Sequence, residues 1–156
     1  MELYGVKREL AFCGFPPDLQ FWNSSMRMRG YAGVGVLISK DFPGGPPIKV
    51  EYDGFGEPGL HDAEGRTLTL HFKHFLLVVT YVPNAGVWRS ENRVTPGSSI
   101  LGLERLEYRV EQWDKDFQRF LKQKLERETR KPVFVCGDMN CSYSEIDIFK
   151  SKAHRR

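Results

Sequence analysis

Residues 67–82, TLTLHFKHFLLVVTYV, hold two apolar stretches that are separated by Lys73 and His74. In the first stretch apolar and polar side chains alternate, which places Leu68 and Leu70 on one side and threonines on the other. The second stretch is apolar almost throughout, as is typical of a strand covered on both faces. Because only two residues separate the stretches, we predict a tight antiparallel hairpin.

Two more strands are predicted upstream of this hairpin. Residues 31–38 alternate small and branched side chains, and Gly33 and Gly35 indicate that a neighbouring strand approaches closely. Residues 48–52, IKVEY, alternate between apolar and polar side chains, as a half-buried strand does. The sequence therefore predicts at least four strands before residue 83.

The N-terminal part carries no periodic apolar pattern. Pro16 and Pro17 interrupt the chain, and Phe21 and Trp22 form an isolated aromatic pair, so we predict an irregular segment over residues 1–29. The first residues, MELYGVKREL, mix acidic and basic side chains without an apolar core, and we expect no signal peptide.

A long amphipathic helix is predicted downstream of the hairpin, over residues 102–129, after a long loop at 83–100. The apolar residues of this helix follow one another at intervals of mostly three and four. They are Leu103, Leu106, Val110, Trp113, Phe117, Phe120, Leu121 and Leu125. Residues 132–136, PVFVC, follow as a short buried strand. Hairpins followed by a helix and a strand predict an α/β fold built on a mixed sheet.

The composition is that of one ordinary domain, with 156 residues, 40% hydrophobic and 13% aromatic. No run of about 18 apolar residues is present, so we expect no membrane-spanning helix. The net charge of +3 permits a polyanionic partner without requiring one. Cys13, Cys136 and Cys141 include no C-x-x-C pair, which argues against a disulfide framework or a structural zinc site and favours a reducing compartment.

Polar side chains follow the last predicted strand in residues 137–140, GDMN. Ligands of α/β folds bind beyond the carboxyl ends of strands, and Asp138 and Asn140 fall on the same side of an extended chain. A carboxylate can deprotonate a water, an amide can donate to a phosphoryl oxygen, and both oxygens can bind Mg²⁺. Four residues of this kind are, however, more often an Asx turn that closes a strand.

A second polar loop follows the apolar strand of the hairpin, in residues 81–86, YVPNAG. Tyr81 would project from the mouth of the strand, and Asn84 lies in a turn fixed by Pro83. A phenol and an amide there can both donate to a phosphate. Taken alone, a segment of this kind is more often an ordinary strand-end turn with a hydrogen-bonded Tyr.

Taken together, the motifs have the order and approximate spacing of apurinic/apyrimidinic endonucleases of the exonuclease III type. They are GYAGVG at 30–35, EGR at 64–66, YVPNAG at 81–86, LEYR at 106–109 with WD at 113–114, GDMN at 137–140 and SEIDI at 144–148. The sequence resembles this family over residues 30 to about 152, which would form the central part of an endonuclease/exonuclease/phosphatase domain. Residues 1–29 then precede it, and 153–156 form a basic tail.

The resemblance implies a DNA-repair enzyme that uses Mg²⁺, with Mn²⁺ as the alternative ion, and cuts double-stranded DNA 5′ to an abasic site. It implies that Asp138 activates the attacking water and that Asn140 stabilises the transition state, with both residues binding the metal ion. Tyr81 would hold the scissile phosphate. The implied DNA-binding residues are Arg66, Asn84 and Arg105. The expected protein is a monomer that binds no membrane and acts in the nucleus, with the mitochondrion as the alternative.

The sequence departs from the family pattern in several places. The strand ending in QET, whose Glu binds magnesium, does not precede residue 30, and the closing SDH motif is also absent. One extra residue lies between Arg109 and Trp113, and an insertion follows Gly86. The resemblance therefore implies a partial four-layer α/β sandwich, with mixed sheets flanked by helices and incomplete at both ends. We expect exposed strand edges and weak cleavage or none.

Four functions are compatible with these motifs. The first is an active abasic-site endonuclease, and the second is a fragment of one that cleaves nothing. The third is another phosphodiesterase or phosphatase of the same superfamily, because such enzymes share the GD-x-N loop. The fourth is a non-enzymatic module that binds DNA or a protein partner, which salt-dependent binding without cleavage would identify.

Overall fold

The computed structural model describes residues 13–26, 29–56, 61, 64–85, 105–127 and 131–144. The predicted insertion after Gly86, most of SEIDI and the basic tail lie outside these residues. The elements are η1 (Pro17–Leu19), β1 (Gln20–Ser24), β2 (Gly33–Leu37), β3 (Lys49–Tyr52), β4 (Thr67–His71), β5 (Leu76–Tyr81), η3 (Tyr108–Trp113), α3 (Asp114–Arg127) and β6 (Val133–Asp138).

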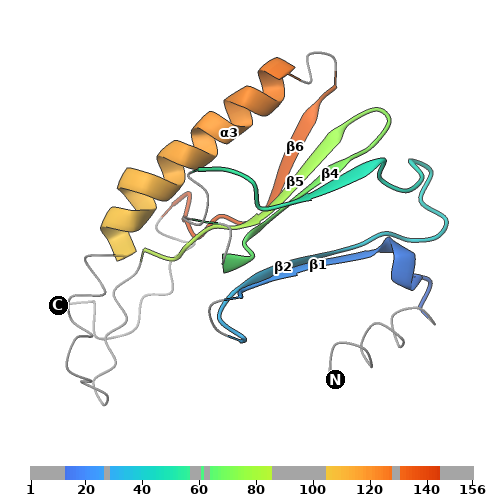
Figure 1. The fold of residues 1–156 in the computed structure, drawn as a ribbon, viewed down its shortest axis with the longest axis horizontal. Helices are drawn as coiled ribbons and strands as arrows, with labels where there is room; N and C mark the ends of the chain where they lie inside the picture. The colour runs from blue at the N-terminus through green and yellow to red at the C-terminus, as the bar shows by residue number, and fades with distance from the viewer. Residues whose placement is uncertain are drawn as a thin grey trace.

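The central sheet has the strand order β3-β4-β5-β6 (Figure 1). The first two pairs are antiparallel and β5 pairs with β6 in parallel, so the sheet is mixed as predicted. The predicted hairpin is confirmed, because the Phe72 amide donates to Phe75 O at 2.9 Å across its turn. Along β5, buried residues alternate with half-buried ones. The strand is therefore covered on both sides, more completely on one.

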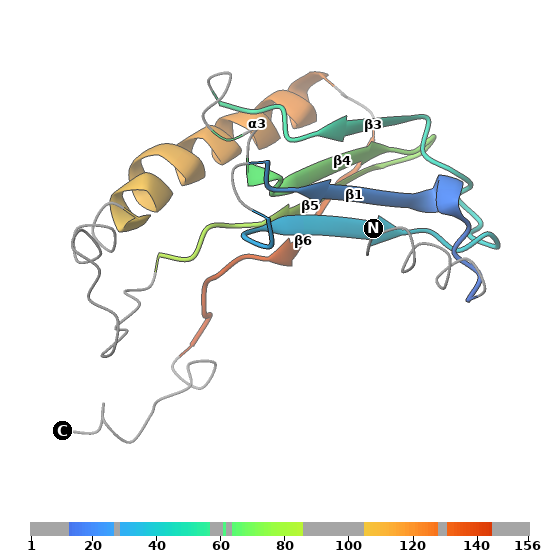
Figure 2. The same ribbon diagram turned by 60° about the horizontal axis from the view of Figure 1, so that its bottom comes forward.

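Three layers are present among the described residues (Figures 1 and 2). Helix α3 covers one face of the central sheet, and the two-stranded sheet β1-β2 covers the other. The core on the helix side consists of Phe55, Val78, Val82, Trp113 and Phe120. The core on the opposite side consists of Ile38, Leu68, Leu70 and Phe72. This arrangement confirms the predicted partial α/β sandwich.

The prediction of an irregular segment over residues 1–29 was wrong for its last part. Gln20–Ser24 form β1, which pairs antiparallel with β2 and places Phe21 opposite Val36. The pairing depends on the glycines of β2, because a Cβ at Gly35 would lie 2.8 Å from the Trp22 ring. The predicted close approach at Gly35 is thus confirmed, and the strand that approaches is the one the sequence did not indicate.

The described part of the long helix departs from the prediction before Asp114. Residues 105–107 are helical and lead into η3, a π-helical segment, before regular α3 begins at Asp114. Leu106 and Val110 were predicted to face the core, but they are 45% and 46% exposed. A π segment holds one more residue per turn than an α-helix, so it rotates the residues that precede it by about 100°. Tyr108 and Arg109 are half-buried instead.

Strand β6 lies at the end of the sheet order and pairs only with β5 among the described strands. The prediction of a buried strand was wrong here, because Phe134 is 54% exposed and Val135 is also exposed. The expectation of an open strand edge with apolar side chains is therefore confirmed for this part of the chain. No described helix is both long enough and apolar enough to cross a membrane.

Candidate active site at the carboxyl ends of β5 and β6

The parallel pairing of β5 with β6 brings the two predicted loops together. Tyr81 and Asp138 are register partners at the carboxyl ends of the strands. The Val82 amide donates to Asp138 O at 2.9 Å, so the pairing continues one residue into the loop. Register partners of neighbouring strands project to the same side of the sheet, so Tyr81 and Asp138 leave the strand ends on one face. The two motifs, 58 residues apart at Val82 and Asn140, thus form one site.

Gly137 allows this close approach. Its φ is +129°, and a Cβ at this position would lie 1.9 Å from Thr80 O. No side chain fits there without a shift of the backbone. Gly137 lies inside β6, where it pairs with Thr80.

Asp138 and Asn140 form the Asx turn that the sequence left open. The Asn140 amide donates to Asp138 Oδ1 at 2.9 Å, and Asn140 adopts a left-handed φ of +45°. The Asn140 side chain crosses to the neighbouring loop, where Nδ2 donates to Val82 O at 2.7 Å. A carboxamide carries a second N–H and an oxygen, and Asp138 has a second carboxylate oxygen. The turn is therefore compatible with ligand binding.

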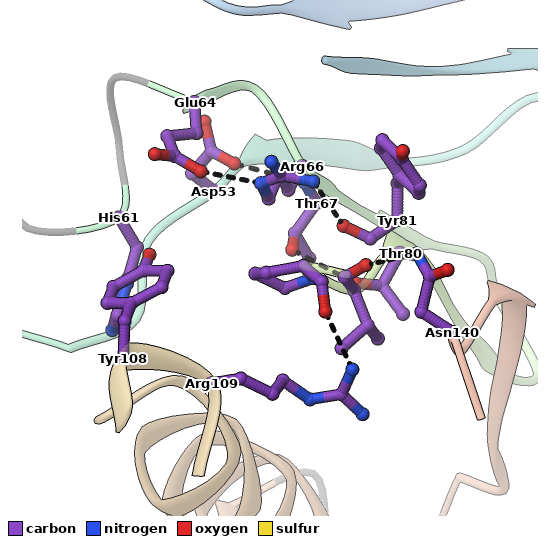
Figure 3. Close-up of polar contacts among 12 residues, drawn as sticks. Asp53, His61, Glu64, Arg66, Thr67, Thr80, Tyr81, Tyr108, Arg109 and Asn140 are labelled. Carbon is purple, nitrogen blue, oxygen red and sulfur yellow. Dashed lines mark hydrogen bonds and ion pairs between the residues drawn. The ribbon is translucent and has the colours of Figure 1, made fainter. Parts of the chain in front are cut away.

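Arg66, predicted to bind the DNA backbone, is only 2% exposed. Its Nε donates to Glu64 at 2.6 Å and its Nη1 to Tyr81 O at 3.2 Å (Figure 3). The guanidinium also lies over the rings of Tyr31 and Tyr81. Burial lowers the pKa of Arg66, but the bond to Glu64 and its charge raise it above the ordinary value. In this structure the residue supports Tyr81 from inside the protein.

The other two predicted DNA-binding residues lie near the loops. Asn84 is exposed in the loop that follows β5, and Arg105 is half-buried at the first described turn of the helix. Both lie close in sequence to residues of the site, Asn84 to Tyr81 and Arg105 to Arg109. Their contact with DNA stays a prediction.

Two residues of the site were missed by the sequence. Arg109 donates through Nη1 to Pro83 O at 2.7 Å and through Nη2 to Met139 O at 3.1 Å, so it contacts both loops. His61 is fully buried against the helix that carries Arg109, between Tyr108 Oη at 2.8 Å and Asp116 Oδ2 at 3.0 Å. The LEYR motif was the only sequence signal for Arg109, and no periodicity marked His61.

Comparison with known proteins decides the family. Residues 3–156 match the profile of the Endonuclease/Exonuclease/phosphatase family, which is nearly the whole chain. The chain belongs to this family. The match includes both loops of the site, and it agrees with the α/β sandwich described above.

Relatives within the Endonuclease/Exonuclease/phosphatase family are DNA nucleases by name. A DNA-(apurinic or apyrimidinic site) endonuclease of Dictyostelium discoideum is 38% identical over 128 residues, 82% of this chain and 29% of that protein. The DNA repair nuclease APEX1 of Danio rerio is 36% identical over 88% of this chain and 36% of its own length. An exodeoxyribonuclease of Bacillus subtilis is 34% identical over 86% and 43%. The chain thus spans less than half the length of these relatives.

The site offers a metal ion few ligands from the described residues. Asp138 and Asn140 place a carboxylate and a carboxamide one residue apart, which suits a hard cation that keeps several water ligands. No group of three His, Cys, Asp or Glu side chains that would hold a metal ion occurs in the part of the chain that the structure describes. These residues therefore fit Mg²⁺ only as a partial coordination shell.

Proposed function

We propose that this chain carries the phosphate-binding centre of a DNA-repair endonuclease that hydrolyses the phosphodiester bond 5′ to an abasic site. The observation that carries the proposal is the register of β5 with β6, which sets Tyr81 beside Asp138 and joins Asn140 to the loop after Tyr81. The names of the relatives, which include apurinic/apyrimidinic-site endonucleases and exodeoxyribonucleases, support DNA as the substrate.

Each side chain of the centre has a group for one part of the hydrolysis. Asp138 Oδ1 accepts the Asn140 amide, so Oδ2 is the oxygen that takes a proton from the attacking water. The second amide N–H of Asn140 donates to a phosphoryl oxygen as negative charge builds on it. The hydroxyl of Tyr81 donates to the phosphate before attack and orients it.

Asp138 and Asn140 are also the residues that would hold the metal ion, with Mg²⁺ preferred and Mn²⁺ as the alternative. When bound, such an ion neutralises charge on the phosphoryl and leaving oxygens. Asp138 and Asn140 offer two side chains to the ion, so we expect this pair to bind it weakly and cleavage to be slow. Asn84 and Arg105 would contact the DNA backbone beside the centre.

The same observation supports a second candidate function. A chain whose phosphate donors are intact but whose metal shell is partial would bind DNA without cutting it. Binding of this kind weakens steeply with salt, because neutralised phosphates release counterions. In both cases we propose that the chain acts as a monomer on double-stranded DNA in the nucleus, with the mitochondrion as the alternative compartment.

The test is cleavage of a labelled duplex that contains one abasic analogue, measured with Mg²⁺ and with a chelator. We expect slow nicking at the analogue with Mg²⁺, and loss of nicking by roughly a hundredfold or more in Asp138→Ala with DNA binding retained. Asp41→Ala is the matched control, because Asp41 is an exposed carboxylate far from the site. Its neighbour Phe42 packs against Phe72, with ring centroids 5.6 Å apart, at the opposite end of the hairpin.

Each outcome separates the candidate functions. Nicking that persists in Asp138→Ala, or binding lost together with nicking, contradicts the role given to Asp138. Salt-dependent binding without any nicking supports the binding module. Release of phosphate from a 3′-phosphorylated end, without nicking at the abasic analogue, identifies another phosphatase of the family.

A further inference from the structure

Three consecutive carbonyls of the loop after β5 each accept a side-chain donor from a different element. Tyr81 O accepts Arg66 Nη1 at 3.2 Å, and Val82 O accepts Asn140 Nδ2 at 2.7 Å. Pro83 O accepts Arg109 Nη1 at 2.7 Å (Figure 3). The loop is therefore held along its length by the sheet, by the loop after β6 and by the helix.

Arg109 differs from the other two donors because it contacts both loops at once. While Nη1 donates to Pro83 O, Nη2 donates to Met139 O at 3.1 Å, directly before Asn140. Its Nε donates to Asp114 at 2.7 Å, and its side chain is 13% exposed. A guanidinium is planar, so fixing Nε on the helix also fixes the direction of both terminal nitrogens.

The π-helical segment changes which residues beside Arg109 face inward. A regular helix with the spacing of the downstream apolar residues would turn Val110 inward, at i−3 from Trp113, and Tyr108 toward solvent. The segment Tyr108–Trp113 reverses this, since Val110 is exposed and Tyr108 is half-buried. The segment also spans the place where the sequence holds one residue more than the family pattern. The inward position of Arg109 is thus kept although the helix must depart from α geometry.

We propose that Arg109 is a positioning residue that clamps the Tyr81 loop to the Asp138–Asn140 loop and fixes the distance between them. A phosphate bound in the centre would contact both loops, so its alignment depends on that distance. The relevance to catalysis rests on the proposed function, whereas the clamp itself is a property of the protein alone. Arg109 reaches backbone carbonyls on either side and would touch no reacting atom.

Amide hydrogen exchange of the whole chain tests the clamp without requiring activity. In Arg109→Gln we expect exchange at Val82 and at the end of β6 to speed up about tenfold to a hundredfold, the effect of losing charged hydrogen bonds from both loops. The Phe72 amide, at the far end of the hairpin, should not change. Arg119→Gln is the control, because Arg119 also pairs with an aspartate of the same helix and is 68% exposed.

A second variant tests whether the clamp needs the planar guanidinium or only its positive charge. Arg109→Lys keeps the charge, but one ammonium cannot hold Asp114, Pro83 and Met139 together, so we expect it to fail to restore protection of both loops. Full restoration by lysine would overturn the clamp. Unchanged exchange in Arg109→Gln would also overturn it, because the residue would then hold neither loop. Equal acceleration at Phe72 and Val82 would overturn it too, because the residue would then stabilise the whole fold rather than the two loops.

Cleavage of the abasic duplex provides the second readout. If the wild-type chain nicks DNA, we expect Arg109→Gln to lower kcat at least about tenfold with little change in KM, since alignment rather than affinity is lost. Unchanged kcat with loosened loops would refute the positioning role. If the wild-type chain does not nick DNA, the proposed function fails, and the exchange result still decides whether the clamp exists.

Discussion

Gly137 has no Cβ, and this allows β5 and β6 to approach closely at the site. The carbonyl of Thr80 occupies the space that a Cβ would need, and the φ of +129° is one that L-residues rarely adopt. The next residue is Asp138, so any shift that relieves a clash would move the candidate general base. The geometry of the site is therefore sensitive to a residue with no chemistry of its own.

Gly137→Ala should destabilise the protein by about 1–3 kcal/mol beyond the ordinary cost of a left-handed residue, because it adds overpacking against backbone. Gly45→Ala is the matched control, since Gly45 has a φ of +68° but open space around its Cβ, and should cost roughly 1 kcal/mol. Urea unfolding of the two variants measures the difference. Equal losses would show that β6 moves without resistance.

At this scale the sequence predicted which two loops meet, but not the surroundings of each side chain. Asp138, Asn140 and Tyr81 lie together as the motifs implied. Arg66 was expected on the DNA surface, but Tyr31 and Glu64 enclose it. The burial of Arg66 depends on side chains from separate strands and loops. A local sequence pattern does not show which of these side chains will surround it.

In the helix that covers the sheet, side-chain contacts with the loops coincide with a departure from regular α-helical geometry. Before Asp114, Tyr108 bonds to His61 and Arg109 bonds to both loops. After Asp114, Phe120 and its neighbours pack on the sheet in regular α periodicity. The π segment lets both sets of contacts form in a chain that holds one residue too many for an unbroken helix.

Deletion of Gln112 should therefore turn the segment into regular α-helix with Arg109 and Tyr108 still facing inward. We expect the free energy of unfolding to rise by about 1 kcal/mol, the net value of a backbone hydrogen bond. The Arg109–Asp114 spacing would become four residues, which suits an ion pair on a helix. Chemical unfolding monitored by circular dichroism measures the change.

Deletion of Gln123, an exposed residue within α3, is the matched control. It has no π turn to absorb the change, so it rotates part of the helix by about 100° and should lower stability by several kcal/mol. If deletion of Gln112 is as damaging as this control, the π segment is itself required for packing of the helix.

Most elements could be predicted from sequence where one strong local pattern fixed them. The hairpin β4-β5 and the alternating strand β3 occur as expected, whereas β6 occurs at the predicted place but is exposed rather than buried. Strand β1 was missed because it is short and polar at Gln20 and Asn23, and its partner β2 contains two glycines, at 33 and 35. The phase of the helix before Asp114 was mispredicted, because the apolar spacing in the sequence is regular whereas contacts with the loops determine the phase.

Across the whole molecule, Glu51 connects the sheet with the helix that covers it. This residue of β3 accepts hydrogen bonds from Lys124 of α3 and, at 2.7 Å, from Lys49, and His71 Nε2 lies 3.1 Å away. Burial raises the pKa of Glu51, but the hydrogen bonds from Lys124 and Lys49 and the nearby charges outweigh it and lower the pKa from 4.5 to about 2.

A carboxyl group with a lowered folded-state pKa stabilises the protein above its unfolded pKa, and the contribution is lost as the pH falls through the folded pKa. We expect stability to decline between about pH 4.5 and pH 2 for this reason. Glu51→Gln should lower the free energy of unfolding at pH 7 by about 1 kcal/mol, after allowance for solvent screening, and flatten that decline.

Thermal unfolding at several pH values measures the effect of Glu51→Gln. Glu111→Gln is the control, because Glu111 forms an exposed pair with Lys115 and should change stability little at any pH. A decline below pH 4.5 that is as steep in Glu51→Gln as in the wild type would assign the acid sensitivity to other carboxyl groups.

The parallel pairing of β5 with β6 also determines when the site forms during folding. The hairpin closes between residues near in sequence, such as Thr67 and Thr80, which are 13 residues apart. The bond from Asn140 to Val82 joins residues 58 apart and closes a far longer loop, which is slower to form. We expect the sheet to begin folding at the hairpin and β6 to dock late. A nascent chain would then hold a partly formed sheet before it holds any site, and the competence to bind phosphate would arrive with the last strand.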